Sequence, residues 1–248
     1  MAVQILWPEV TEVTPLSPDE ARVFAVPVDE VDASEDELLA TLSAEEREHA
    51  ERFQSDRARR QFVAGRAALR MLLGRLFVLP AANVELTIDA HGKPRVSGPG
   101  GSTLPKFNLA HSEDMVLVAV AFGCEVGVDV ERVRAVSRWE QMARRYFHAG
   151  EVEEIFAAPP AERDAAFLRC WTGKEAVVKA IGGGLSESLA AFHVPVKNHH
   201  GTWVEIPRAV AGSAVRCWLQ PLLPNSDYVG AVACVGEKRR VSFFTLRP

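Results

Sequence analysis

Two carboxylates lie two positions apart in a stretch that otherwise has the pattern of a buried strand. The stretch reads GVDVERV over residues 127 to 133, with Asp129 and Glu131 between valines. Because alternate residues of a strand point to the same side, Val128 and Val130 can face the core while both acids project from the other face. Two acids on a solvated strand face are the more common meaning of this pattern. A divalent cation would turn their repulsion into binding, and Mg²⁺ is typically held by one or two carboxylates together with substrate phosphates.

A third carboxylate occurs about 40 residues later, in the stretch WTGKEAVVKA. On a helix, Trp171, Glu175 and Lys179 fall at positions i, i+4 and i+8, which form one stripe. A surface ion pair beside a core tryptophan would explain the stripe equally well. A carboxylate and an ammonium near Gly173, where a backbone can approach closely, also suit a site that holds Mg²⁺ and a phosphate together.

Helices and strands that could position these groups are visible in the periodicity. Ser43 and Glu46 have the spacing of a capping box that opens a helix. Helical spacing of apolar residues predicts two longer helices, at 56–79 and 162–182, the second closed by glycines 182–184. Strands are predicted within 84–89, 107–122, 192–196, 202–206 and 215–235.

The order helix, strand, turn, strand occurs twice along the chain, which indicates an internal duplication of about 110 residues. Chance similarity of two α+β patterns is the alternative. With a boundary near 122–126, we expect an N-terminal half at 1–123 and a C-terminal half at 124–248. Two such halves would leave a cleft between them, where ligand sites are common.

Composition excludes several classes of function. The 248 residues are 48% hydrophobic and 25% charged, which is ordinary for a globular protein. A formal charge of -5 and a pI near 5.8 argue against a protein that coats nucleic acid. The cysteines form no CxxC pair, which predicts reduced thiols rather than a zinc site or a disulfide framework: Cys124, Cys170, Cys217 and Cys234. With neither a secretory leader pattern nor a membrane-length apolar run, we expect a cytoplasmic protein.

Together, GVDVE and WTGKEAVVKA resemble the paired signature of the 4'-phosphopantetheinyl transferases, specifically the larger Sfp-type enzymes with two similar halves. The likeness extends upstream through FNLAHSEDMVLVAVA and HGKPRV to DRARRQFVAGRAALR, and covers roughly residues 45 to 200. It implies an α+β fold of two similar α/β halves related by pseudo-two-fold symmetry, with the active site in the cleft between them. It also implies Mg²⁺-dependent transfer of the phosphopantetheine arm of coenzyme A to a serine of an acyl or peptidyl carrier protein, releasing adenosine 3',5'-bisphosphate.

The resemblance also assigns roles to the acids and lysines. Asp129 and Glu131 match the metal-binding pair, and Glu175 matches a third acid that is a metal ligand or the general base. Either Glu175 or a metal-bound water could accept the proton of the carrier serine. Lys179 matches the lysine that contacts the pyrophosphate, whereas Lys174 lies about 100° around the helix and ranks lower. Asp129, Glu175 and Lys179 are thus the expected catalytic set, with Mg²⁺, or alternatively Mn²⁺, as the cofactor.

Coenzyme A contacts are implied by the same resemblance. His111 matches a histidine at the coenzyme A phosphates, while Arg57 and Lys93 match positions that hold the 3'-phosphate. A solvated arginine face is the alternative for the basic segment around Arg57. The family usually has serine before the histidine, where this chain has Ala110, so a hydroxyl contact is expected to be absent unless Ser112 replaces it.

The carrier protein is expected to meet the arginines that follow the metal pair. The carrier domains that this family modifies tend to be acidic. We hypothesise that Arg144 and Arg145 bind the carrier, and that Tyr146 and Phe147 add apolar contacts. The alternative is that these arginines pair on a solvated surface with the nearby glutamates Glu151, Glu153 and Glu154.

The partners and the carrier class follow from the same likeness. The Trp-x-x-Lys-Glu-Ala form resembles the subgroup tied to polyketide, lipid and broad carrier modification, including carriers of fatty acid and nonribosomal peptide synthesis. Two fused halves favour a monomer, and neither nucleic acid nor membrane is an expected partner. The rival from another class is a non-catalytic module that binds coenzyme A or another phosphate ligand on the same fold.

Overall fold

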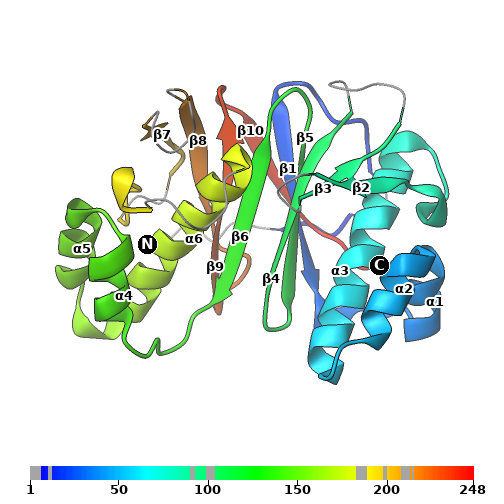
Figure 1. Cartoon of the computed structure of the whole chain (residues 1–248), viewed down its shortest axis with the longest axis horizontal. Coiled ribbons are helices and arrows are strands. Elements are labelled where there is room, and N and C mark those ends of the chain that lie inside the picture. The colour runs from blue at the N-terminus through cyan, green and yellow to red at the C-terminus, as the bar shows by residue number, and fades with distance from the viewer. Residues whose placement is uncertain are drawn as a thin grey trace.

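Two sheets of four strands, each with a long helix against it, form the two halves of the molecule (Figure 1). The computed structural model describes residues 7–10, 13–89, 93–98, 104–182, 189–197, 200–207, 213 and 215–248. The first half contains β1 (Glu20–Pro27), η1 (Val28–Glu30), α1 (Glu35–Thr41), α2 (Ala44–Glu51), α3 (Asp56–Phe77), η2 (Ala81–Asn83), β2 (Leu86–Ile88), β3 (Pro94–Val96), β4 (Lys106–Ser112) and β5 (Met115–Ala121). The second contains β6 (Val126–Arg132), α4 (Trp139–Tyr146), α5 (Ala149–Phe156), η4 (Pro160–Glu162), α6 (Arg163–Ile181), η5 (Leu189–Ala191), β7 (Thr202–Ile206), β8 (Val215–Leu222), β9 (Tyr228–Val235) and β10 (Arg240–Thr245).

Helix boundaries follow the signals in the sequence. The expected capping box is present at the start of α2, where the Ser43 side chain accepts from the backbone N–H of Glu46 and the Glu46 side chain accepts from that of Ser43. Helix α3 ends at Phe77; the next residue, Val78, adopts the left-handed conformation two positions before Pro80. The apolar side of α3 packs on the first sheet through buried leucines: Leu69, Leu72 and Leu73.

The two halves repeat one topology. In the first, β1 pairs antiparallel with β5, and β5 pairs antiparallel with β4. In the second, β6 pairs antiparallel with β9, and β9 with β8. Helices α3 and α6 follow the first strand of each set. This arrangement confirms the predicted α+β fold of two similar halves.

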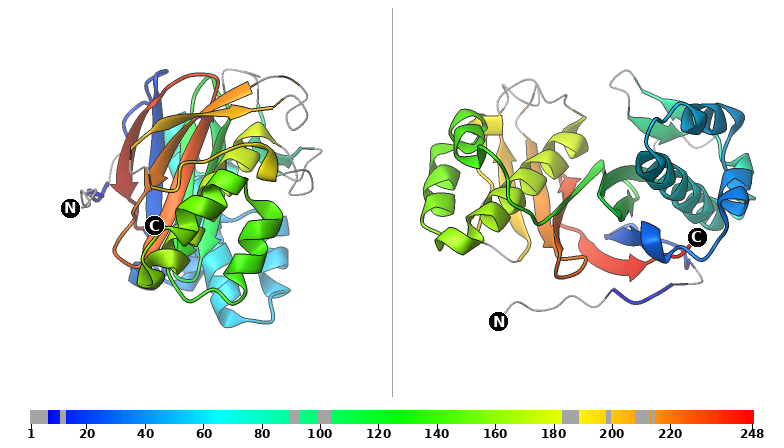
Figure 2. Two further views of the ribbon diagram at one scale, coloured as in Figure 1. Left: turned by 90° about the vertical axis from the view of Figure 1, so that its left-hand side faces the viewer. Right: turned by 90° about the horizontal axis from the view of Figure 1, so that it is seen from below.

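The last strand does not stay with the second half. β10 pairs parallel with β1, so it completes the first sheet, whose order is β10-β1-β5-β4. The pattern analysis predicted neither β1 nor β10. The segment Trp7–Val10 runs beside β10, where Val10 N–H donates to Thr245 O and the Trp7 indole donates to Leu223 O, close to β8 (Figure 2). The division at residues 123 and 124 stays a prediction.

One predicted strand is wrong. Residues 192–196 form no strand, and they pair with none of the strands of the described chain. The N–H of Val194 donates to Glu151 Oε1 at 2.6 Å, and the N–H of Val196 donates to Glu154 Oε2 at 3.1 Å. Because side chains of α5 satisfy these amides, the segment is held without a strand partner.

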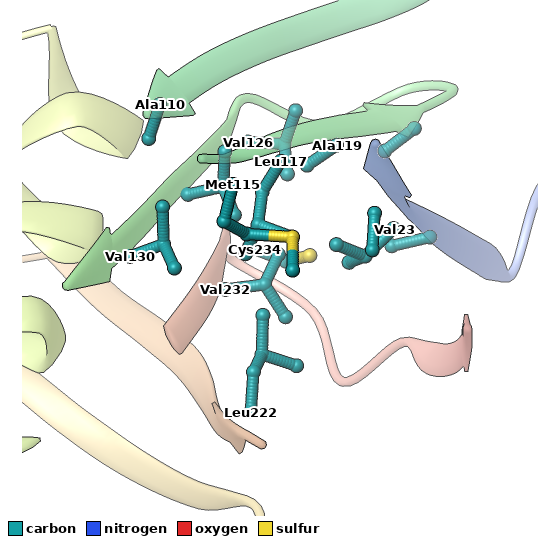
Figure 3. Close-up of a cluster of buried hydrophobic side chains, with 14 of the residues drawn as sticks. Val23, Ala110, Met115, Leu117, Ala119, Val126, Val130, Leu222, Val232 and Cys234 are labelled. Carbon is teal, nitrogen blue, oxygen red and sulfur yellow. The ribbon is translucent and has the colours of Figure 1, made fainter. Parts of the chain in front are cut away.

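A hydrophobic core lies between the two sheets and joins the halves (Figure 3). It contains Ala110 of β4, Leu117 and Ala119 of β5, and Val126 and Val130 of β6. The valines of the acidic strand therefore face this core, as the alternation predicts. Strands β4 and β6 lie next to each other where the two sheets meet (Figure 1).

Helix α6 lies against β6 at a distance that only glycine permits. A Cβ added at Gly127 would lie 2.1 Å from the carbonyl oxygen of Ala176 and 2.4 Å from the backbone nitrogen of Ala180. These are backbone atoms of α6, so no side chain can turn aside to make room. Gly127 therefore lets α6 bring its polar residues directly over the acidic strand.

Gly127→Ala is expected to lower the free energy of unfolding by about 3 kcal/mol, because the added methyl group must push α6 away from β6. Urea denaturation measures the change. Gly150→Ala is the matched control: in α5 its Cβ would meet only histidine side chains at 3.4 to 3.5 Å, and alanine favours the helix, so stability should stay within about 1 kcal/mol. Equal effects of the two substitutions would contradict the proposed close packing.

Candidate active site

Strand β6 and helix α6 bring Asp129, Glu175 and Lys179 together. Asp129 is 7% exposed, and its Oδ1 accepts from Lys179 Nζ at 2.7 Å. The same ammonium group lies 3.4 Å from the carbonyl oxygen of Val128. The expected stripe on α6 thus meets the expected acid on β6.

The electrostatics of these acids reflect burial and like charge. Burial raises the pKa of Asp129 to about 6; Lys179 opposes the shift, and Glu175 and Glu131 add to it. Burial also raises the pKa of Glu175. The charge of Lys179 opposes this shift, and the charge of Glu131 adds to it. Glu175 is 7% exposed, and its Oε1 has no hydrogen-bond partner among the described residues. A buried carboxylate oxygen without a partner is costly unless a ligand satisfies it.

Glu131 lies beyond Asp129 on the same strand, where its Oε2 accepts from the hydroxyl of Ser112 at 2.8 Å. Within the described ranges, no three His, Cys, Asp or Glu side chains are close enough together to hold a metal ion as they stand. The donor set still fits a hard cation. All three predicted ligands are carboxylates, they interact electrostatically, and Glu175 Oε1 is unpaired.

His111 lies on β4, so it approaches the site from the first half. Burial and the charge of Lys179 lower its pKa, while Glu131 opposes the shift, so the ring is within electrostatic reach of both groups. Beside it is a cavity of about 220 Å³ between α3 and β4. Its lining includes Phe53, Gln61, Phe62, Arg66, Pro94, Asn108 and His111. A larger hollow of about 680 Å³ lies at the end of α3, lined by Val13, Met71 and Val78 among others and by none of the predicted site residues.

The two predicted contacts to the 3'-phosphate already have protein partners. Lys93 is 9% exposed, and its Nζ donates to Val126 O and Lys179 O, each at 3.0 Å, and to Glu125 Oε2 at 3.3 Å. Burial lowers the pKa of this lysine, while the charge of Glu125 opposes the shift. The ammonium group therefore ties β6 to α6. Gly92, the residue before Lys93, lies outside the described residues.

Arg57, the other predicted contact, opens α3 and lies beside the turn between β4 and β5. Its guanidinium group donates to Asp114 Oδ2 at 2.6 Å and also pairs with Glu113. The hydrogen bond from Arg57 to Asp114 raises the arginine pKa. Whether Arg57 and Lys93 bind coenzyme A stays a prediction.

Ala110, where the family usually has serine, is 5% exposed and lies in the core between the sheets, as Figure 3 shows. Its neighbour His111 is exposed. Because successive residues of a strand point to opposite faces, position 110 faces β6 and position 111 faces the cavity.

Sequence reasoning missed the role of a buried ion pair beneath the site. Lys174 and Glu151 are both fully buried, with Lys174 Nζ 2.8 Å from Glu151 Oε1. The ammonium group also donates to Leu189 O at 2.6 Å and to Phe192 O at 2.8 Å. Lys174 thus anchors α6 to α5, to η5 and to the residue that follows η5. Gly173 serves the same packing, since its Cβ would lie 2.7 Å from a Val194 methyl group rather than near the acids.

Comparisons with known proteins agree with this architecture. Residues 125–233 match the family described as the 4'-phosphopantetheinyl transferase superfamily, and residues 32–123 match the 4'-phosphopantetheinyl transferase N-terminal family. The 4'-phosphopantetheinyl transferase HetI of Nostoc sp. is 32% identical over 94% of this chain and 95% of its own length. The chain belongs to the 4'-phosphopantetheinyl transferases. This transferase is also 27% identical to Sfp of Bacillus subtilis, over 68% of the chain and 73% of Sfp.

Membership in this family makes the protein an enzyme that transfers phosphopantetheine to carrier proteins, with coenzyme A as a substrate. A further relative, AcpT of Salmonella typhimurium, is 38% identical over 50% of this chain and 60% of its own. The expected resemblance and the expected class of reaction are thereby confirmed. In the described parts of this transferase, no helix is long and apolar enough to cross a membrane.

Asp129→Asn is expected to change how stability depends on pH. The folded-state pKa of Asp129, about 6, lies above its ordinary value of 3.8, so the folded protein binds this proton more tightly than the unfolded chain does. Its contribution to stability is present below pH 3.8 and is lost as the pH rises toward 6. Asparagine removes this loss. Without divalent ions, the stability of the variant relative to the unsubstituted transferase should rise by roughly 1 to 3 kcal/mol between pH 4 and pH 7.

Chemical denaturation across that pH range tests the expectation. Asp36→Asn removes the same charge from an exposed position on α1 and controls for net charge. A stability difference between Asp129→Asn and the unsubstituted transferase that does not change with pH would contradict the assigned cause.

Proposed function

We propose that this transferase catalyses phosphopantetheine transfer with Asp129, Glu131 and Glu175 as ligands of Mg²⁺. The observation that supports the proposal most is the unpaired, buried Oε1 of Glu175 next to the ion pair between Asp129 and Lys179. When bound, the metal would neutralise charge on the pyrophosphate oxygens of coenzyme A. Mn²⁺ has the same preference for oxygen and is an alternative.

In the proposed reaction, the hydroxyl oxygen of a carrier serine attacks the β-phosphorus of coenzyme A. A new P–O bond forms to the serine, and the bond to adenosine 3',5'-bisphosphate breaks. Glu175 is the proposed proton acceptor: it would ligate the metal through one carboxylate oxygen and accept the serine proton on the other. Lys179, which is partly exposed at the C-terminal end of α6, would bind the pyrophosphate.

The nucleotide end of coenzyme A is proposed to lie along His111 and the cavity of about 220 Å³ between α3 and β4. Phe62 and Arg66 of the cavity wall offer an aromatic face and a cation, which suit a base and a phosphate. Arg57 would serve as a phosphate contact only by sharing its guanidinium group with Asp114. The cavity is adjacent to the acids through β4, so one extended ligand could reach both.

We also propose that the enzyme works as a cytoplasmic monomer. Both halves of the site belong to one chain, and the four cysteines are free and buried, as suits a reducing compartment.

Incubation of apo carrier proteins with the enzyme, coenzyme A and Mg²⁺ should add one phosphopantetheine to the carrier, as measured by intact mass. Asp129→Ala and Glu175→Gln should each reduce the rate at least about 100-fold, because each removes a proposed ligand of the metal that neutralises the reacting phosphates. Glu205→Gln on β7 is the control, since it removes an exposed acid that is not part of the site. Coenzyme A binding without mass gain on any carrier would instead indicate a non-catalytic binding module.

The carrier is proposed to dock on the exposed arginines between β6 and α5. Five arginines are exposed there, and within the described structure none of them forms an ion pair with an acid: Arg132, Arg134, Arg138, Arg144 and Arg145. Two of the glutamates that could have paired with these arginines bind other residues: Glu151 binds Lys174, and Glu154 binds His193. An unpaired basic surface next to the site suits an acidic carrier.

The apolar part of the docking hypothesis needs one correction. Phe147 is 4% exposed and stacks on Phe167, so it belongs to the core and cannot meet a carrier. Tyr146 is 38% exposed, with the Arg145 guanidinium 5.1 Å from its ring centroid. Arg144 lies 4.7 Å from the ring centroid of Phe156. The docking surface is therefore Arg144, Arg145 and Tyr146.

Reversing the charge of Arg144 and Arg145 to glutamate should raise the KM for the carrier about tenfold or more, while kcat and the KM for coenzyme A change little. Steady-state kinetics with varied carrier gives these constants. The control reverses two cations elsewhere, Arg75 and Lys238, and should leave the KM for the carrier unchanged. An unchanged KM in the first variant would refute the docking surface.

A further inference from the structure

Strand β6 has one edge that no strand of its own sheet covers. In the sheet order β6-β9-β8-β7 it pairs only with β9. The backbone of Glu125 and Val133, just outside its ends, bonds on the β9 side through Val235 N and Asp227 O. Because backbone groups alternate along a strand, those of Val126, Val128, Val130 and Arg132 face the other edge. That edge lies next to β4, the edge strand of the first sheet.

Side chains of the first half, rather than a backbone ladder, bond to this free edge. These bonds run from Lys93 Nζ to Val126 O at 3.0 Å, from Val128 N to Asn108 Oδ1 at 2.9 Å, and from Arg132 N to Ser112 Oγ at 3.1 Å. Asn108 and Ser112 both come from β4 and lie on the face that points toward β6. The first half therefore fixes the strand that carries the acids of the second half.

Ser112 makes the contact that reaches an acid directly. Its hydroxyl is the acceptor for Arg132 N–H and the donor to Glu131 Oε2, at 2.8 Å. The residue is 9% exposed, so little water competes for these bonds. A hydroxyl has one hydrogen, and here that hydrogen is directed at the carboxylate. The Glu131 carboxylate is thus held relative to both β4 and its own backbone.

We propose that Ser112 is a positioning residue for Glu131: by holding Oε2 from the first half, it fixes the carboxylate that would ligate the cation. The inference rests on the proposed function, because it takes Glu131 as a metal ligand. Groups that hydrogen-bond to metal ligands typically contribute a factor of 10 to 100 to metal affinity. Ala110, on the same face of β4, has no hydroxyl, and Ser112 is the hydroxyl of β4 that contacts the acidic strand.

The test measures Mn²⁺ binding by electron paramagnetic resonance of free Mn²⁺ in the presence of coenzyme A, without any carrier and hence without turnover. Ser112→Ala should raise the Kd for Mn²⁺ about tenfold. Ser242→Ala is the matched control: Ser242 donates to Glu20 Oε1 at 2.7 Å in the first sheet, so it loses the same kind of bond far from the acids and should bind Mn²⁺ normally. Thermal unfolding of both variants shows whether they are folded.

A double-substitution cycle separates positioning from a general structural effect. If Ser112 acts through Glu131, Ser112→Ala should have no further effect on Kd in a Glu131→Gln background. An equal loss of Mn²⁺ affinity on Ser112→Ala in both backgrounds would overturn the inference. It would also be overturned if Glu131→Gln weakens Mn²⁺ binding while the folded Ser112→Ala variant keeps an unchanged Kd. If Glu131→Gln leaves the Kd unchanged, the proposed ligand set fails, and the inference fails with it.

Discussion

The close contact between helix α6 and strand β6 is the constraint on which the site depends. Gly127 has no side chain, so the helix backbone lies directly on the strand, and the two acids of the strand meet the stripe of α6. Any larger residue there would separate Asp129 from Lys179. The charges then follow from the geometry, since groups brought this close and out of water interact strongly. The raised pKa of Asp129 follows mainly from its burial beneath α6.

Around this contact, the protein uses buried charged groups as ties between elements. Lys93 joins β6 to α6, and Lys174 joins α6 to α5 and to η5. Each ammonium group is almost fully enclosed and bonds to several oxygens, which is the condition under which a buried charge is tolerated. These bonds add to the close packing at Gly127 in fixing the position of α6.

Local pattern in the sequence was sufficient for the strand GVDVE, the stripe on α6, the helix cap at Ser43 and the duplicated order of elements. These depend on periodicity, which each segment expresses by itself. Local pattern was insufficient where contacts with residues distant in the sequence decide the structure of a segment. Residues 192–196 have the composition of a strand, but glutamate side chains of α5 take up the amides of Val194 and Val196. Likewise, nothing local to Lys93 indicates that its ammonium group turns inward to bond to backbone carbonyls. In each case, a contact with a residue distant in the same chain determined the local structure.

The parallel pairing of β10 with β1 has a consequence for how the molecule is made. Glu20 pairs with Arg240, so the first sheet contains a strand that the ribosome produces only after nearly all of the second half. Until then one side of β1 presents open backbone groups, which is the kind of edge that joins other chains. Contacts between residues so far apart in the chain form late and slowly in folding. The second half can therefore form around its own helix first, and the half that is synthesised first is the one that is completed last.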